Sequence, residues 1–503
     1  SPCLATPEVL QNYVGGTWVT AQAREFVNVH NPAVGAVIAK TPLSTRADLD
    51  AAVAAAARAF PGWRDTPVVQ RARALFKFVH LLEQHHEEIA RTVTTEHGKT
   101  LDEARGSVRR GIECVEVACG APSLMMGYGL EQIATNVDST VFRQPLGVVA
   151  AITPFNFPAM VPLWFLPFAV ATGNCIIVKP SEQVPLSARL MFRLLEQCDL
   201  PPGVVSMVNG GREIVEGICD HPGIRAVSFV GSTPVARAVY QRGTHAGKRV
   251  QALGGAKNHM VVLPDADIDM AADAAVSAGY GSAGERCMAI ATIVAVGDVA
   301  DPLVEAIKAR LPRIKVGPGS DETSEMGPLV TKQHRDKVAS YLDSSAEQGA
   351  TVVADGRELP LYQESDGFFL GVSLIDHVTP TMDAYRDEIF GPVLTVVRVR
   401  TYDEAVALIN DNPYGNGTAI FTRDGGAARQ FQFEVNAGMV GINVPIPVPV
   451  AYYSFGGWKH SLFGDLHMYG PEGIQFYTRA KIVTSRWPDP GTSKIDLGFP
   501  RTR

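Results

Sequence analysis

Cys287 has the surroundings that a chemically reactive thiol needs. It follows a run of small residues at 281–284 and directly adjoins Arg286. A thiol reacts as its thiolate, and a neighbouring cation or a helix N-terminus lowers its pKa from an ordinary value of roughly 8.5. Glycine lets the backbone come close to the atom that the sulfur attacks. The stretch therefore fits a cysteine nucleophile, but it also fits a buried structural cysteine, which is the commoner role of a lone Cys.

Asn156 could supply a second part of such chemistry. A thiol that attacks a carbonyl creates an oxyanion, which needs hydrogen-bond donors already in place. The side-chain amide of Asn156 and a backbone N–H at the nucleophile would provide two donors. Taken alone, however, an Asn two residues before Pro158 is more often a turn residue.

Two further stretches could bind a dinucleotide. Lys179 and Glu182 lie three residues apart, just past a predicted strand, where they can hold the two hydroxyls of an adenosine ribose. A carboxylate there would repel a 2′-phosphate and so favours NAD over NADP. Residues 229–236 are expected to form strand, loop and helix, and N–H groups at a helix start bind phosphate. An exposed ion pair explains the first stretch equally well, and the second is not a Gly-x-Gly-x-x-Gly motif.

An α/β pattern of elements positions these residues. Buried strands are predicted at 148–152, 175–179, 204–208 and 226–230, and helices at about 160–172, 187–198 and 212–219. This alternation indicates a parallel, doubly wound sheet, whose ligands bind at the carboxyl ends of strands. A second α/β unit is expected over about 256–445, with strands at 290–296, 351–353, 393–399, 418–421 and 439–443.

The two ends of the chain have other patterns. Short strands are predicted over 15–43, and helices over 47–60, where Pro61-Gly62 should end the helix, over 70–95 and over 99–119. Alternating polar and apolar residues predict an exposed hairpin at 131–145. The tail carries a lone predicted strand at 481–484, which could pair with that hairpin or with another subunit.

Composition excludes several classes of protein. A length of 503 residues predicts two or three domains. The net charge of −7, without a basic block, argues against a nucleic-acid partner. No apolar run reaches the ~18 residues that span a membrane, and no signal-peptide pattern opens the chain. We therefore expect a cytoplasmic protein, or a mitochondrial one if a leader has been removed.

Neither a disulfide framework nor a metal site is expected. The cysteine count is odd, with residues at 3, 114, 119, 175, 198, 219 and 287, and no Cys-x-x-Cys pair occurs. His85-His86-Glu87-Glu88 lacks the further histidine of a His-Glu-x-x-His zinc motif. These residues fit a solvated helix face better.

Several motifs, in this order and at this spacing, resemble the aldehyde dehydrogenase superfamily from about residue 15 to about residue 487. The loop Gly-Ser-Ala-Gly-Glu-Arg-Cys-Met-Ala at 281–289 is similar to the nucleophile loop of the CoA-acylating methylmalonate-semialdehyde dehydrogenases. The C-terminal stretches 453–459, 464–467 and 476–478 resemble the same branch.

The resemblance implies an aldehyde dehydrogenase-like α/β fold and a set of functional residues. It assigns residues 1–122 and 146–254 to an NAD-binding domain, 255–447 to a catalytic domain, and 123–145 with 471–487 to strands of a small oligomerisation element. Cys287 is then the nucleophile and Asn156 the oxyanion donor. The residues assigned to NAD are Thr153, Phe155, Lys179, Glu182, Gln183, Gly231, Ser232, Gly254, Glu388 and Phe390.

One departure separates this chain from the hydrolytic members. They carry a glutamate just before Leu-Gly-Gly, where it activates the water that cleaves the thioester, and here that residue is Ala252. Alanine cannot act as a general base, so the acyl-enzyme needs a nucleophile that requires little activation, and the thiol of coenzyme A fits. Arg110 and Arg286 match the substrate arginines of the branch. Two guanidiniums can clamp a carboxylate, although Arg109 could face inward instead of Arg110.

The resemblance therefore predicts an NAD-dependent, CoA-acylating homotetramer, a dimer of dimers. It would oxidise methylmalonate or malonate semialdehyde with loss of CO2, giving propionyl-CoA or acetyl-CoA. Two alternatives remain open. A hydrolytic aldehyde dehydrogenase would need another base, such as Glu285 or His467. A binding protein that has kept the fold is disfavoured by the intact Cys287, Asn156 and Glu388.

Overall fold

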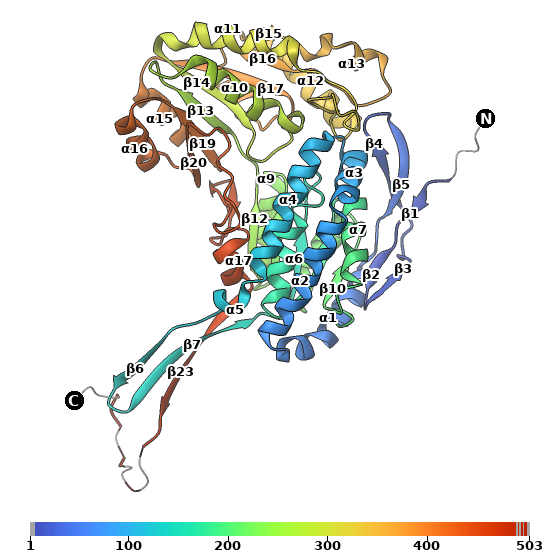
Figure 1. The fold of residues 1–503 in the computed structure, drawn as a ribbon, viewed down its shortest axis with the longest axis vertical. Helices are drawn as coiled ribbons and strands as arrows, with labels where there is room; N and C mark the ends of the chain where they lie inside the picture. Colours follow the sequence, from blue (N-terminus) through green and yellow to red (C-terminus); the bar gives the residue numbers. More distant parts are fainter. Residues whose placement is uncertain (1–5, 489–490, 492–493, 496, 500–503) are drawn as a thin grey trace.

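The computed structural model describes residues 6–488, 491, 494–495 and 497–499. Two α/β units lie against each other, and a narrow arm of strands projects from one of them (Figure 1). Each unit is built on one large sheet. The fold class predicted from the sequence is confirmed.

The first sheet has the strand order β22-β12-β11-β8-β9-β10-β2-β3. Its centre consists of parallel strands whose residues are almost all buried, because helices cover both faces of the sheet. These strands are β8 (Val148–Ile152), β9 (Cys175–Lys179), β10 (Val205–Met207), β11 (Ile224–Val230) and β12 (Arg249–Leu253). The edge strands β2 (Asn12–Val14), β3 (Thr17–Val19) and β22 (Leu462–Phe463) are antiparallel.

Helices pack on both faces of this sheet. One face is covered by α1 (Arg46–Asp65), α8 (Arg212–Asp220) and α9 (Thr233–His245), and the other by α6 (Pro162–Ala171). Behind α6 lie α2 (Val68–Gln84) and α4 (Leu101–Ala118), and α7 (Leu186–Leu195) packs against α3 (His86–His97). The short α5 (Ala121–Leu124) follows α4.

Two helix boundaries predicted from the sequence were wrong. Pro61 does not end α1, which continues to Asp65. The extra turn buries Trp63, whose Nε1 donates to the carbonyl of Val170 at 3.0 Å. The helix predicted over 70–95 breaks at His85 into α2 and α3. Apolar spacing does not reveal this break, because both segments keep an apolar face toward the same core.

The second sheet has the order β15-β16-β17-β14-β13-β19-β20, and all neighbours are parallel except the edge strand β15. Its strands are β13 (Asn258–Val262), β14 (Ile290–Val296), β15 (Thr351–Ala354), β16 (Ser373–Asp376), β17 (Val393–Val399), β19 (Gly417–Phe421) and β20 (Met439–Ile442). Its helices are α10 (Ile268–Tyr280), α11 (Ala300–Arg310), α12 (Lys332–Glu347), α13 (Pro360–Glu364), α14 (Asp383–Arg386), α15 (Tyr402–Asp411) and α16 (Gly425–Glu434).

The arm is a three-stranded antiparallel sheet of β6 (Gly129–Ala134), β7 (Val137–Pro145) and β23 (Thr478–Arg486). The tail strand runs beside β7 over its whole length, from Thr478 opposite Pro145 to Arg486 opposite Val137. The predicted pairing of the tail with the hairpin is therefore confirmed. Helix α17 (Gly470–Phe476) leads into it.

The remaining strands are short. β1 (Glu8–Val9), β4 (Phe26–Asn31) and β5 (Ala36–Pro42) form a sheet near the N-terminus, and β18 (Tyr414–Gly415) pairs with β21 (Trp458–Lys459). The predicted domain boundaries stay a prediction, and β22 adds a segment beyond residue 447 to the first sheet. Within the described part of the chain, no helix is both long and apolar enough to cross a membrane.

Candidate active site

A strained turn presents Cys287. Helix α10 ends at Tyr280, and the turn that follows places Ser282 and Ala283 in the left-handed region, with φ of 53° and 52°. Non-glycine residues rarely adopt this conformation, and such strain persists where surrounding contacts enforce it. One contact comes from Glu103 of α4, whose Oε1 accepts a hydrogen bond from the Ser282 N–H at 2.6 Å.

The backbone of Cys287 is fixed from the opposite side. Its carbonyl accepts hydrogen bonds from the side-chain amides of Asn258 at 2.9 Å and of Asn416 at 3.1 Å. These partners come from the starts of two neighbouring strands, β13 and β19. The sulfur is half-buried, whereas the other cysteines of the described residues are buried, and all of them are free. Cys3 lies outside the described residues.

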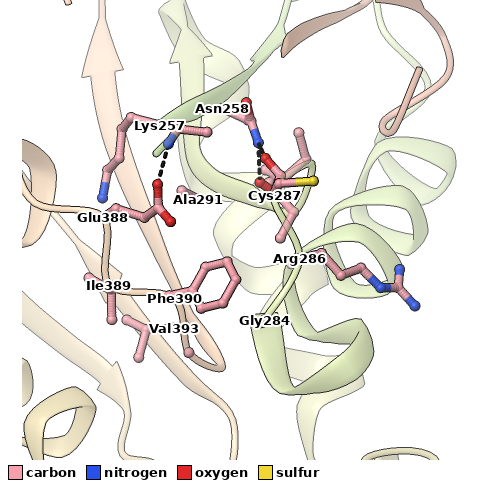
Figure 2. A pocket seen from close by; sticks show the side chains of 15 residues that line it. Lys257, Asn258, Gly284, Arg286, Cys287, Ala291, Glu388, Ile389, Phe390 and Val393 are labelled. Carbon is pink, nitrogen blue, oxygen red and sulfur yellow. Dashed lines mark hydrogen bonds between the residues drawn. The ribbon is translucent and has the colours of Figure 1, made fainter. Parts of the chain in front are cut away.

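Two clefts meet at Cys287. The first, here called the inner cleft, also contains Glu388, Phe390, Lys257 and Arg286 (Figure 2). Glu388 lies just before β17, and its Oε2 accepts a hydrogen bond from the Ala256 N–H. Burial raises the pKa of Glu388 to about 7. The structure thus brings the predicted nucleophile together with two residues predicted to bind the cofactor.

Aromatic rings line the approach to the inner cleft. Phe155 and Phe390 meet edge to face, with ring centroids 5.7 Å apart. Phe155 also stacks on His97, at a centroid distance of 6.5 Å. Phe390 has a φ of 57°, which is an outlier for a bulky residue. Strain of this kind clusters at ligand-binding sites.

Cys287 is not predisposed to ionise, contrary to the expectation from its neighbour Arg286. Burial and then the negative charge of Glu388 raise the pKa of the thiol to about 12, against the opposite effects of backbone N–H groups and of Arg286. The effect of the Arg286 guanidinium is the smallest of these, and its Nη2 donates to Glu103 Oε1 at 2.9 Å, so the carboxylate offsets part of its positive charge.

The second cleft, here called the outer cleft, has a volume of about 390 Å³. Its charged lining consists of Lys99, Glu103, Arg110 and Arg286 beside Cys287. The apolar lining, which the sequence analysis missed, consists of Phe157, Met160, Trp164, Met288, Ile446, Val448 and Phe455. The signal that could have found Phe157 is its place directly after Asn156.

The structure distinguishes the two adjacent arginines of α4. Arg110 lines the outer cleft, and its Nη1 lies 3.6 Å from Glu113 Oε2. Arg109 points elsewhere and forms a bidentate ion pair with Glu83 on the surface. Among the two, Arg110 is therefore the residue that can meet a ligand at Cys287.

Asn156 is buried directly before Phe157, and its side-chain amide forms no hydrogen bond with the residues that the structure describes. Its carbonyl accepts a hydrogen bond from Lys99 Nζ at 2.7 Å. The predicted oxyanion donor is thus tied to the outer cleft through its backbone. The predicted role of its amide stays a prediction.

A third hollow, of about 450 Å³, lies between α8 and α9 at the carboxyl end of β9. Lys179 and Glu182 line it, as the ribose prediction requires, together with the apolar side chains of Val215 and Val235. Lys179 Nζ donates to the carbonyls of Gly210 at 2.7 Å and Pro180 at 2.8 Å, and lies 3.4 Å from Glu182 Oε2. Such a groove suits a flat aromatic ring beside a ribose.

The loop that carries Glu182 is anchored from α3. The buried carboxylate of Glu96 accepts hydrogen bonds from the backbone N–H groups of Leu186 at 2.7 Å and Ser187 at 3.0 Å, at the start of α7. Burial raises the pKa of Glu96 to about 7, against these hydrogen bonds. Gln183 lies half-buried in the same loop, where its N–H donates to Ser181 Oγ at 3.4 Å.

The predicted phosphate-binding residues surround the start of α9. Ser232 is the N-cap residue, and Gly231 directly follows β11, which ends at Val230. Thr233 Oγ1 accepts a hydrogen bond from the Gly255 N–H at 2.8 Å. A Cβ on Gly254 would lie 2.7 Å from the carbonyl of His460, so only glycine fits there. Thr153 is buried nearby, and its N–H donates to the carbonyl of Lys179 at 3.1 Å.

None of the three positions considered for a hydrolytic base, Ala252, Glu285 and His467, lines either cleft at Cys287. Ala252 is buried within β12. Glu285 is fully buried and lines neither cleft at Cys287, and burial raises its pKa well above the ordinary value. His467 also lies outside both clefts, with Nδ1 3.3 Å from Glu472 Oε2. No group of three or more potential ligands among the described residues could hold a metal ion.

Comparison with known proteins gives a consistent set of matches. A model of the aldehyde dehydrogenase family matches residues 18–483. A malonate-semialdehyde dehydrogenase of Pseudomonas aeruginosa is 53% identical over 493 residues, which cover 98% of this chain and 99% of that protein. The solved structure of a methylmalonate-semialdehyde dehydrogenase from Oceanimonas doudoroffii has a TM-score of 0.94 and 50% identity, covering 96% of this chain and 99% of that one. A Sinorhizobium meliloti protein described as a methylmalonate-semialdehyde dehydrogenase, and solved with NAD, has a TM-score of 0.95 and 48% identity, covering 97% and 100%.

Proposed function

This chain belongs to the aldehyde dehydrogenase family, and on that basis we propose that it oxidises malonate or methylmalonate semialdehyde with NAD and passes the acyl group to coenzyme A. The observation that carries the proposal is the position of Cys287 where the two clefts meet, with Ala252 in place of a general base. The names of the relatives support the semialdehyde class of substrate.

Cys287 acts as the nucleophile. Its sulfur forms a bond to the aldehyde carbon, and the carbonyl oxygen becomes an oxyanion. Donors placed where that charge develops lower the barrier, and we assign this role to the Asn156 amide and the Cys287 N–H. When the oxyanion collapses, hydride leaves the carbon and a thioester to Cys287 remains.

NAD supplies the hydride acceptor when it is bound, and the residues present fit it. Lys179 and Glu182 would hold the adenosine ribose, with Gln183 in the same loop, and Gly231 and Ser232 the phosphates. Glu388 would bind the nicotinamide ribose, while Phe155 and Phe390 shape the space for the ring. Thr153 and Gly254 complete the surroundings. The NAD complex of the Sinorhizobium protein supports this assignment.

Arg110 and Arg286 would hold the carboxylate of the substrate at the outer cleft. Guanidiniums bind carboxylates through charge-assisted and often paired hydrogen bonds. The β-carboxylate of the thioester leaves as CO2, the electron pair of the broken C–C bond stays on the neighbouring carbon as a thioester enolate, and that carbon takes up a proton from water. The thiol of coenzyme A then attacks the thioester and releases acetyl-CoA or propionyl-CoA, because thiolates need less activation than water.

The proposal includes an assembly and a location. Exposed apolar residues on the arm, such as Leu130 and Ile482, support its pairing with other subunits, and we propose a homotetramer. The proposed location is the cytoplasm.

The test is NADH formation from malonate semialdehyde, with and without coenzyme A. With coenzyme A we expect steady turnover, and without it a burst of about one NADH per site followed by a stall, because no base hydrolyses the thioester. Cys287→Ala should abolish even the burst while NAD binding persists. Equal steady rates with and without coenzyme A would contradict the acylating mechanism.

A further inference from the structure

The outer cleft contains a buried lysine that the proposed mechanism does not use. Lys99 is 1% exposed and lies between α3 and α4. Its Nζ donates to the carbonyl of Asn156 at 2.7 Å and lies 3.8 Å from the centroid of the Phe157 ring. The side chain lines the same cleft as Cys287. A lysine in such a position is unusual, because the burial of an ammonium group is costly unless it is paired.

Lys99 is not paired with a carboxylate. Among the described residues, no carboxylate oxygen lies within 4.0 Å of its Nζ. The Nζ group donates its hydrogen bond to the carbonyl of Asn156. The negative charges of Glu103 of α4 and Glu285 of the nucleophile turn raise the pKa of Lys99, whereas the positive charge of Arg286 lowers it. Burial outweighs them and lowers the pKa of Lys99 to about 7. A neutral amine has a lone pair that can take a proton.

Cys287 needs a proton acceptor. Burial raises the pKa of its thiol, so the proton must leave as the sulfur attacks. We propose that Lys99 is the group that takes up the proton released by the Cys287 thiol. The S–H bond breaks as the S–C bond forms, the Lys99 amine becomes an ammonium, and its positive charge then faces the outer cleft beside the new oxyanion.

The other groups around Cys287 are less suited to this role. Arg110 and Arg286 are always protonated and cannot accept a proton. Glu103 already accepts hydrogen bonds from Ser282 and Arg286. Glu388 could take a proton, but its neutral form would leave no positive charge to stabilise the oxyanion. Lys257 lines the inner cleft, where its Nζ donates to the carbonyls of Ala384 and Asp387, both at 2.7 Å.

Cys287 is reactive when its thiol and the Lys99 amine together hold one proton more than the thiolate and neutral amine, and one fewer than the thiol and ammonium. This state appears as the pH rises through the pKa of Lys99, whichever of the two atoms holds the remaining proton. Thiol reactivity should therefore rise with a midpoint near pH 7. Without the amine, the rise should move to the pH at which the buried thiol itself ionises.

The test is alkylation of Cys287 by iodoacetamide as a function of pH, followed by mass spectrometry of the peptide that contains it. The inference rests on the proposed role of Cys287, but the assay uses neither NAD, coenzyme A nor aldehyde. An inactive enzyme whose alkylation depends on Lys99 would thus contradict the proposed substrate and leave this inference standing. Cys287→Ala shows which peptide carries the label.

Lys99→Met should lose the rise near pH 7 and react on the order of 10- to 100-fold more slowly at pH 7.5, within the range of general-base effects. Lys99→Gln removes the amine but keeps an N–H donor for the Asn156 carbonyl, so it guards against misfolding. The matched control is Lys248→Met. Lys248 is another buried lysine, and its Nζ donates to the carbonyls of His221 and of Ile224, the latter at 2.8 Å, outside both clefts.

A folded Lys99→Met or Lys99→Gln protein with the midpoint of the wild type would overturn the inference, and so would an equal effect of Lys248→Met. If neither Lys99 variant folds, the wild-type profile is compared with that of Glu388→Gln, because the pKa of Glu388 also lies near 7. A midpoint near 7 that persists in Glu388→Gln supports the inference, whereas its loss in that variant, or a wild-type midpoint at or above the value of roughly 8.5 for a free thiol, overturns it.

Discussion

The two arginines of the outer cleft lie beside carboxylates before any ligand arrives. Arg286 is bound to Glu103, and Arg110 lies near Glu113. In the proposed mechanism, a substrate carboxylate would therefore meet guanidiniums that acidic partners already orient. Orientation reduces the entropy lost on binding, while the neighbouring carboxylates limit the attraction for anions in general. This arrangement favours a ligand that can reach both guanidiniums.

Arg110→Leu should reduce kcat/KM for methylmalonate semialdehyde on the order of ten- to a hundredfold. A hydrogen bond to a charged group is worth roughly 1.5–3 kcal/mol, and about 1.4 kcal/mol corresponds to a factor of ten. Propanal, which has no carboxylate, should be oxidised at an almost unchanged rate. The matched control is Arg109→Leu, because Arg109 pairs with Glu83 at the surface. A similar loss for propanal would make Arg110 a structural residue.

Glu285 is a fully buried carboxyl group two residues before the nucleophile, and its surroundings disfavour the charged form. Its oxygens have no hydrogen-bond partner among the described side chains and lie 3.9 Å from Nε2 of His97 and of His334. His97 Nδ1 accepts a hydrogen bond from the Lys99 N–H at 3.2 Å, so a neutral His97 carries its proton on Nε2, facing Glu285. Burial raises the pKa of Glu285 and lowers that of His97. Burial therefore favours the neutral form of both groups.

Glu285→Gln should stabilise the protein, and more at pH 8 than at pH 5. The folded pKa of Glu285 lies above its unfolded value, so the folded state binds this proton more tightly and loses stability as the pH rises from the unfolded pKa to the folded one. Glutamine resembles the protonated acid and does not titrate. A difference of one between the folded and unfolded pKa corresponds to about 1.4 kcal/mol, which sets the scale of the gain at the higher pH. Denaturant unfolding at both pH values measures it, and an equal effect at the two would contradict the assignment of the proton to Glu285.

At the scale of elements, α4 connects the two sides of the outer cleft. It carries Glu103, which accepts hydrogen bonds from the nucleophile turn and from Arg286. About two turns further along the same helix it carries Arg110. Its close contact with α6 occurs at Gly111, where an added Cβ would lie 2.8 Å from Leu163 Cδ1 and 3.3 Å from Met160 Cα. The small residue sets the distance between these helices.

Gly111→Val should destabilise the protein by about 1–3 kcal/mol, the usual cost of overpacking a core. It should also lower kcat/KM for the semialdehyde, because α4 positions Arg110. Gly106→Ala, in the same helix, is the stability control: no atom lies within 4 Å of its added Cβ, so the substitution should stabilise the helix by about 0.5–1 kcal/mol. Denaturant unfolding measures the free energy of unfolding of both variants. Equal values would show that α4 and α6 can move apart without loss of stability.

At the scale of the whole molecule, the arm exposes large apolar side chains to solvent. Leu130 and Ile482 are 60% and 71% exposed. Leu130 lies opposite Ser139, and Ile482 lies opposite Val141, so these side chains share one face of the sheet. An exposed apolar face of this kind marks an interaction site.

Ile482→Glu should split the proposed tetramer into smaller species, because it buries a charge at the expected contact. Sedimentation measurements at several protein concentrations report the change. Val34→Glu places the same charge at an exposed apolar residue in the turn between β4 and β5 and should leave the assembly intact. A monomeric wild-type protein, or an unchanged assembly for Ile482→Glu, would exclude the arm as an interface.

The sequence by itself determined the α/β class, most strands and the identities of the candidate site residues. Strands such as 290–296 were predicted correctly because continuous apolar runs between turn signals are local features. The residues around Cys287 were found because their motifs also lie within short stretches. Local patterns, however, do not contain the energy of long-range packing. This is why the burial of Trp63, which extends α1 past Pro61, was missed.

Only the tertiary structure decided what surrounds each of these residues. The pairing of Arg286 with Glu103, the choice of Arg110 over Arg109 and the burial of Lys99 all join segments far apart in the chain. The pKa of Cys287 follows from the same packing, because burial and Glu388 outweigh the adjacent cation. Charge interactions and desolvation depend on distance in space, which residue spacing along the chain does not provide.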